Sequence, residues 1–291
     1  MKQALIATIA FALIYAFQIV LQQVFVRGAI EPLHLNFLSY TVSTIILTCY
    51  FLLFRKKDFI VKPEKKITPF FFVALIGWML ADFFAVYGLK FSSSINYSIL
   101  SRLMIFVVFI LSVFFLKEKV TLNKILSTIL AVVGSILVIY KFQAKLAINW
   151  GDVFFLITVF VQSISSVTRQ KVTKHISSIQ LTYLMFLYAS IIFGAITVIF
   201  MPIKSISSYG FILVNSVTGL IGFSLVNYAI QKGGAVFFTL AANMLPIFTI
   251  LLSFIILKQA PLISQVGGGI LIVASIFLFQ RKKSILINPR K

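Results

Sequence analysis

The sequence predicts an all-α integral membrane protein with ten transmembrane helices arranged as a 5+5 inverted repeat. The first observation is composition: 60% of the 291 residues are hydrophobic, 11% are charged, and the mean hydropathy is +1.08. A water-soluble domain of this length cannot bury so much apolar side chain. The second is that the apolar residues form blocks long enough to cross about 30 Å of hydrocarbon as helices. The third is that the second half of the chain repeats the first.

Each of the ten apolar blocks is expected to form one helix, because lipid offers no hydrogen-bond partner to an unpaired backbone group. In chain order, the blocks span residues 4–26, 33–54, 68–89, 94–116, 122–140, 151–170, 179–200, 210–230, 236–257 and 262–280. The sixth block is the least apolar, since its second half reads QSISSVTRQ.

The internal repeat is visible without gaps when residues 78–121 are aligned on residues 219–262, an offset of 141 (219 − 78). Five is an odd number of spans, so the second copy enters the membrane upside down relative to the first. The predicted division is a first repeat at 1–141, an outer connecting loop at 142–149, a second repeat at 150–280 and a basic cytoplasmic tail at 281–291. Substrate sites of duplicated membrane proteins form where the two halves meet.

The net charge of +20 comes from Lys and Arg in short loops between the blocks. Most of them, including Arg169 and Lys171, fall on the side that holds both termini. This bias predicts cytoplasmic termini and a multi-pass protein of the plasma (inner) membrane. The basic loops face anionic membrane lipid, which explains the charge without nucleic acid as a partner.

Polar residues recur on one face of three predicted helices. They are Tyr15, Gln18 and Gln22 in the first block, Asn36, Tyr40 and Ser43 in the second, and Thr158, Gln162 and Ser166, with Arg169, in the sixth. An unpaired amide in hydrocarbon costs several kcal/mol, so these faces are expected to point away from lipid. They either hydrogen-bond across helix interfaces as packing contacts or line a water-filled cavity. Their occurrence in equivalent spans of both halves favours the cavity.

Two strongly ionised residues lie well inside predicted spans, Asp82 in the third and Arg102 in the fourth. Both are expected about 10–12 Å below the outer end of their helices. Either they form a fixed ion pair that orients the two helices, or Arg102 faces the cavity and binds an anionic group such as a carboxylate. The repeat places Asn243 at the position of Arg102 and Phe223 at that of Asp82. The charges are thus asymmetric in a symmetric scaffold, which favours a specialised role.

Five further residues are weaker candidates. Tyr87 and Tyr228 are repeat equivalents that suit either a cavity wall or an interfacial belt. Asn227 and Asn243 suit either substrate contacts or caps of broken backbone. Pro246 removes the donor to a carbonyl one turn earlier, around Ala242. The resulting kink is either a gate or static.

Three segments resemble a known family. LKEKVTLNKILSTILAVVGSILVI at 116–139 is similar to the end of an EamA-type domain of the drug/metabolite transporter superfamily. Residues 87–93 resemble the segment before the fourth helix of that domain, and residues 243–248 resemble its proline-bearing fourth helix. Two departures are the missing acid in the second-half turn, 258–262, and Ile105 where the repeat has Pro246.

The resemblance covers nearly the whole chain, as two copies. It implies a ten-helix bundle with cytoplasmic termini and a central cavity between helices 1–4 and 6–9, while helices 5 and 10 lie at the periphery. It also implies movement of a small metabolite across the membrane.

The sequence contains no enzyme, cofactor or metal-site motif. We therefore expect a secondary transporter that moves a small polar or amphipathic metabolite, first an amino acid or related carboxylate, by alternating access. The alternatives are a non-transporting scaffold or sensor, and a facilitative channel. The run Gly267–Gly269 allows close helix approach, within the bundle or across a homodimer.

Overall fold

The computed structural model describes residues 1–28, 30–56, 64–92, 97, 100–118, 121–139, 149–201, 203, 209–245, 247–248 and 263–280. The elements in this part of the chain are helices. They are α1 (Lys2–Gly28), α2 (Pro32–Phe54), α3 (Thr68–Phe91), the 3-10 helix η2 (Ser101–Leu103), α5 (Met104–Leu116), α6 (Leu122–Ile139), α7 (Trp150–Val172), α8 (Ser178–Phe200), α9 (Tyr209–Gly233), α10 (Ala235–Ala241), the 3-10 helix η3 (Ala242–Met244) and α12 (Ile263–Gln280).

These helices follow the predicted apolar blocks. Six of them, α1, α2, α3, α7, α8 and α9, are long and apolar enough to cross a membrane, and four shorter apolar helices accompany them. Large apolar side chains on the outer surface remain exposed, as lipid-facing residues are. The chain is therefore a multi-pass, all-helical membrane protein. The count of ten spans stays a prediction, because blocks 94–116 and 236–257 are only partly among the described residues.

Proline and capping residues mark the N-termini of several helices, close to where the apolar blocks begin. Pro32 occupies the first turn of α2, where its missing N–H costs nothing. Asn149 and Asp152 form a capping box at the start of α7, and Ser177 and Gln180 form another at the start of α8. At the turn from α9 to α10, Gly234 has a φ of 84°, a conformation that glycine adopts without a Cβ penalty.

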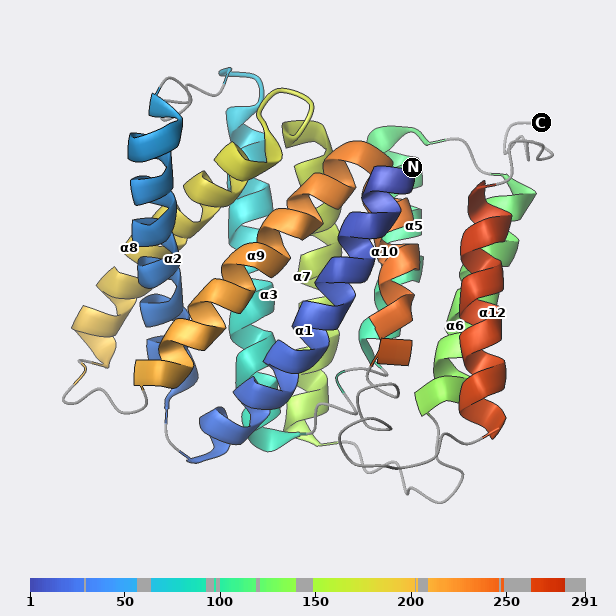
Figure 1. Ribbon diagram of the computed structural model, residues 1–291, viewed down its shortest axis with the longest axis horizontal. Helices are drawn as coiled ribbons and strands as arrows, with labels where there is room; N and C mark the ends of the chain where they lie inside the picture. Colours follow the sequence, from blue (N-terminus) through green and yellow to red (C-terminus); the bar gives the residue numbers. More distant parts are fainter. Residues whose placement is uncertain are drawn as a thin grey trace.

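The helices pack in the pattern expected of two repeats related by a two-fold axis. α2 packs against its repeat equivalent α8, and α6 packs against its equivalent α12. The other large contacts, α3 with α7 and α1 with α9, are an equivalent pair. In Figure 1, α1 begins and α12 ends at the same, upper side of the bundle.

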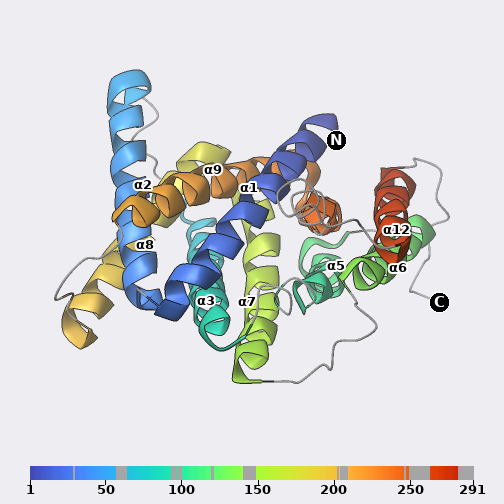
Figure 2. The same cartoon turned by 60° about the horizontal axis from the view of Figure 1, so that its bottom comes forward.

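The pair α6–α12 lies at the edge of the molecule, as the resemblance implied for helices 5 and 10 (Figures 1 and 2). The two backbones come close at Gly134, where a Cβ would stand 2.7 Å from the carbonyl oxygen of Gly268. This peripheral position leaves the other helices to surround the centre.

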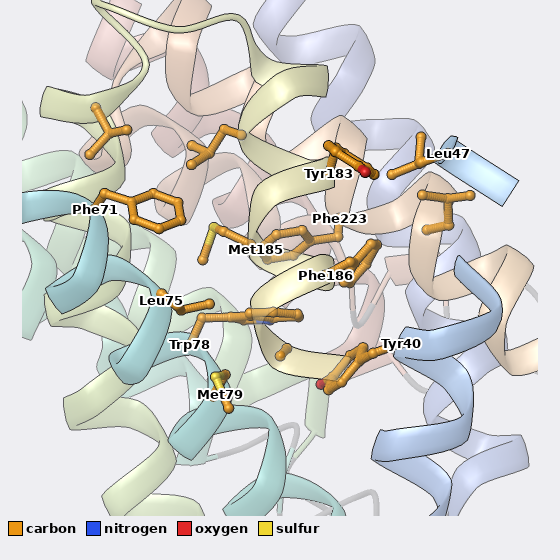
Figure 3. Close-up of a cluster of buried hydrophobic side chains, with 14 of the residues drawn as sticks. Tyr40, Leu47, Phe71, Leu75, Trp78, Met79, Tyr183, Met185, Phe186 and Phe223 are labelled. Carbon is orange, nitrogen blue, oxygen red and sulfur yellow. The ribbon is translucent and has the colours of Figure 1, made fainter. Parts of the chain in front are cut away.

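An aromatic layer joins four helices inside the bundle. Trp78 of α3 stacks on Phe223 of α9 with ring centroids 4.3 Å apart, and Phe186 of α8 packs on both. Tyr40 of α2 completes the layer, with its ring 4.9 Å from Trp78 (Figure 3). The layer forms part of the wall of the central cavity.

Candidate functional site

A cavity with a volume of about 160 Å³ lies between the two repeats. Helices α1, α2, α3 and η2 of the first repeat and α7 to α10 and η3 of the second contribute to its lining. Nine of the twelve residues predicted to bind substrate line it: Tyr15, Gln18, Gln22, Asn36, Tyr40, Asp82, Arg102, Gln162 and Asn243. The polar faces recognised in the sequence thus converge on one space.

Arg102 sits where the two repeats meet. Its side chain is 7% exposed, and its Nη1 donates to the side-chain oxygen Oδ1 of Asn243 at 3.0 Å. Its Nη2 donates to Ser101 Oγ at 2.9 Å. Arg102 and Asn243 are repeat equivalents, and equivalent residues that touch must lie close to the two-fold axis that relates them. Both belong to 3-10 segments, η2 and η3, which are also equivalent and often mark a functional hinge.

The Ala242 carbonyl, which the sequence predicts to lack a donor from Pro246, accepts from the backbone N–H of Leu245. Nη1 of Arg102 in the other repeat donates to the same oxygen at 3.0 Å. Arg102 is therefore a second donor to the carbonyl that the sequence singled out. Pro246, the predicted gating residue, lies outside the described residues.

Asp82 has a different partner from the one that the ion-pair interpretation requires. The hydroxyl of Tyr40 donates to its carboxylate. Ion pairs among the described residues join Lys90 to Glu31, Lys124 to Glu118 and His175 to Glu64, and none joins Asp82 to Arg102. The direct pair is therefore wrong: neutral groups of other helices lie against both charges, so each stands apart from the other in the cavity wall.

Two hydrogen-bonded groups in the wall include residues that the sequence analysis missed. Asn215 Oδ1 accepts from Nε2 of Gln18 at 3.2 Å and of Gln22 at 3.1 Å, and Asn215 Nδ2 donates to Ser39 Oγ at 2.9 Å. The hydroxyls of Tyr15 and Tyr97 lie 2.9 Å apart. Asn215 could have been found as an amide within an apolar block.

Three buried amides of the wall keep a polar atom without a protein partner. These atoms are the donors Asn36 Nδ2 and Asn243 Nδ2 and the acceptor Gln162 Oε1. A buried polar group that is left unpaired costs about 1–3 kcal/mol. The three atoms have almost no accessible surface, so a polar ligand or water would pair with them only after side chains of the wall move.

The other three predicted residues lie away from the cavity lining. Tyr87 packs against Phe83 and Phe154. Tyr228 is linked to Gln3 at 3.3 Å at an exposed position. Asn227 is fully buried but accepts from Arg169 Nη1 at 3.1 Å.

Arg169, placed by the sequence on the polar face of the sixth block and on the inner side, lies in the last turn of α7 with a fully buried side chain. The sequence indicated the face of this residue but not its burial. Among the described residues, no group of three or more His, Cys, Asp or Glu side chains could hold a metal ion.

Comparison with known proteins agrees with this geometry. The EamA-like transporter family matches twice, at residues 2–140 and 149–281. An uncharacterized transporter of Haemophilus influenzae is 22% identical over 243 residues, covering 78% of this chain and 80% of that protein. A crystal structure of another protein shares the fold with a TM-score of 0.76 at 15% identity, covering 96% of this chain and 97% of that one. The chain belongs to the EamA-like transporter family and is a membrane transporter.

Proposed function

We propose that this transporter is a secondary transporter of the plasma (inner) membrane that moves a zwitterionic metabolite, first an amino acid, by alternating access. It would do so with ten spans as an inverted repeat and both termini in the cytoplasm. The observation that carries the proposal is the cavity between the repeats, whose described lining holds one cation, Arg102, and one anion, Asp82.

The chemistry of the wall suits the two ends of an amino acid. Arg102 presents a planar guanidinium, whose geometry matches a carboxylate. Asp82 and Tyr40 present oxygen atoms that accept from an ammonium group. A zwitterion whose two charged groups reach Asp82 and Arg102 would contact both at once. The side chains of Asn36 and Asn243 line the same space.

The inverted repeat supports alternating access. The two halves have similar sequences and meet at a 3-10 segment from each, so each half can take the conformation of the other. The substrate then stays near the axis while the helices around it exchange contacts.

The test is thermal unfolding of the purified full-length protein with each of the twenty standard amino acids. Two sets of control ligands are matched to the amino acids: the corresponding amines, which lack the carboxylate, and the N-acetyl derivatives, which lack the ammonium. We expect the apparent Tm to rise with a zwitterion and with neither derivative, because a ligand that binds only the folded state stabilises it. Counterflow of that amino acid in proteoliposomes then tests transport.

The variants Arg102→Ala and Asp82→Asn should each lose the Tm rise and the counterflow. Tyr87→Phe is the matched control, since Tyr87 is outside the cavity lining, and it should keep both. The proposal is wrong if no amino acid raises the Tm, or if both cavity variants respond as the unmodified protein does.

A further inference from the structure

A second polar cluster lies near the ends of α7, α8 and α9 that are predicted to be cytoplasmic. Arg169 Nη1 donates to Asn227 Oδ1 and Nη2 donates to Ser166 Oγ, each at 3.1 Å. Asn227 Nδ2 in turn donates to Thr182 Oγ1 at 3.0 Å. All four side chains are fully buried. The cluster is separate from the lining of the central cavity, which includes none of these residues.

The charge of Arg169 has only neutral neighbours. Among the described residues, no carboxylate lies within ion-pair distance of it. Its Nε is buried without a hydrogen-bond partner. The ring of Phe223, 5.0 Å from the guanidinium carbon, supplies a cation–π contact. Burying a cation without a counter-charge is costly, so an anion that reaches this cluster would be bound by it.

Phe223 separates the cluster from the central cavity. Its ring lines the cavity and stacks on Trp78, while Arg169 lies against the same ring. Figure 3 shows Phe223 beside Phe186 and Trp78 in the aromatic layer. Displacement of this one side chain would therefore join the two polar regions.

The repeat relates this cluster to the opposite end of the cavity. The offset that pairs Gln18 with Gln162 also pairs Gln22 with Ser166. Asn36 and Thr182 are both the fifth residue of equivalent 23-residue helices. Gln22 and Asn36 line the cavity toward its predicted outer end. Exchange of conformation between inverted repeats would give the region around Ser166 and Thr182 the arrangement now seen around Gln22 and Asn36, which borders the cavity.

We propose that Arg169 is a second anion-binding site, for the carboxylate group of the transported metabolite, which opens to the cytoplasmic side when the inner ends of α7, α8 and α9 separate. The inference rests on the proposed function, because it uses alternating access. It adds a residue that binds the substrate on its path between Arg102 and the cytoplasm.

The test measures access and charge preference with a cysteine beside Arg169. Thr182→Cys is made in the full chain with Cys49→Ser, which removes the only native cysteine. Inside-out membrane vesicles are treated with a methanethiosulfonate that carries a sulfonate, and separately with one that carries a trimethylammonium. We expect Thr182→Cys to react. Arg169→Gln should lower the ratio of the sulfonate rate to the trimethylammonium rate by at least about fivefold, because one charge at close range is lost.

Three further variants complete the test. Asn227→Asp, which keeps Arg169 but places a carboxylate beside it, should lower the same ratio even if Arg169→Gln does not fold. Arg169→Lys should keep most of the preference. Asn36→Cys, the repeat counterpart, is the control: treated from the predicted outer side in right-side-out vesicles, its ratio should not respond to Arg169→Gln.

The inference is overturned if Thr182→Cys does not react in these vesicles, or if its rate ratio is unchanged by both Arg169→Gln and Asn227→Asp. These outcomes are distinct from failure of the proposed function, which would appear as absent amino acid binding and counterflow in the unmodified protein.

Discussion

The α3–α7 and α1–α9 interfaces join equivalent helices of the two repeats, but their backbones approach differently. At α3–α7, two hydroxyl groups of α7 donate to carbonyls of α3, Ser165 Oγ to Ala74 at 2.7 Å and Thr158 Oγ1 to Ala81 at 3.2 Å. At α1–α9, the carbonyl of Asn215, the equivalent of Ala74, accepts from Gln18 Nε2 at 3.5 Å. Short hydroxyl side chains therefore bridge α3 and α7, whereas a long amide side chain bridges α1 and α9.

Glycine accounts for part of the difference. Because Gly88 in α3 has no Cβ, the ring of Phe155 packs directly against its backbone. A Cβ at position 88 would stand 2.4 Å from a ring carbon of Phe155, which is fully buried. The repeat equivalents of these two residues are Ala229 and Phe11, and Phe11 lines the cavity. Both interfaces border the cavity, but Phe155 packs into the space over Gly88, whereas its equivalent Phe11 lines the cavity. Equivalent positions of the two repeats are thus packed differently.

The largest effect that bears on this comparison is expected from Gly88→Ala, which installs the residue found at the equivalent position 229. The added Cβ would overlap Phe155, so α3 and α7 must separate, at a cost of about 1–3 kcal/mol. The measurement is thermal unfolding in detergent. Gly222→Ala is the control in the other interface, because the nearest atom to its Cβ is 3.7 Å away. Equal loss of stability in both variants would show that the glycines do not distinguish the interfaces.

A smaller effect is expected from Asn215→Leu at α1–α9. The change removes the acceptor of Gln18 and Gln22 and the donor to Ser39. Water in the cavity can replace some of these bonds, so we expect a loss of about 1–2 kcal/mol. Unfolding in urea or heat measures it, with Asn215→Asp as the variant that keeps the acceptor. A fully stable Asn215→Leu protein would mean that packing alone holds α1 on α9.

The smallest effect is expected from Ser165→Ala at α3–α7, about 0.5–1 kcal/mol. The variant loses the 2.7 Å bond to the Ala74 carbonyl, but the glycine-mediated packing around it stays. Its Tm should therefore fall less than that of Gly88→Ala. If it falls more, hydrogen bonding rather than close packing closes this interface.

Much of the candidate site could be predicted because membrane helices obey a strong rule. Polar faces such as Gln18–Gln22 and Asn36–Tyr40 must point inward, and the cavity lining contains them. Tyr87 and Tyr228, for which the sequence left a cavity wall and an interfacial belt open, lie outside the cavity lining. The sequence could not choose, because an aromatic side chain suits several environments. The burial of Arg169 could not be predicted either, because a basic residue near a helix end is usually a solvated charge.

The sequence by itself determined the helical class, the membrane environment and the repeat, since each follows from local apolarity or from self-alignment. It also predicted that Pro246 offers no N–H to the Ala242 carbonyl. Only the tertiary structure showed that Arg102 donates to that carbonyl. It also showed that Asp82 accepts a hydrogen bond from Tyr40 and not from Arg102, and that Arg169 is buried beside Phe223. The physical reason is that periodicity defines which face of a helix is polar, whereas partners depend on how close two helices approach, and that is set by packing across the whole bundle.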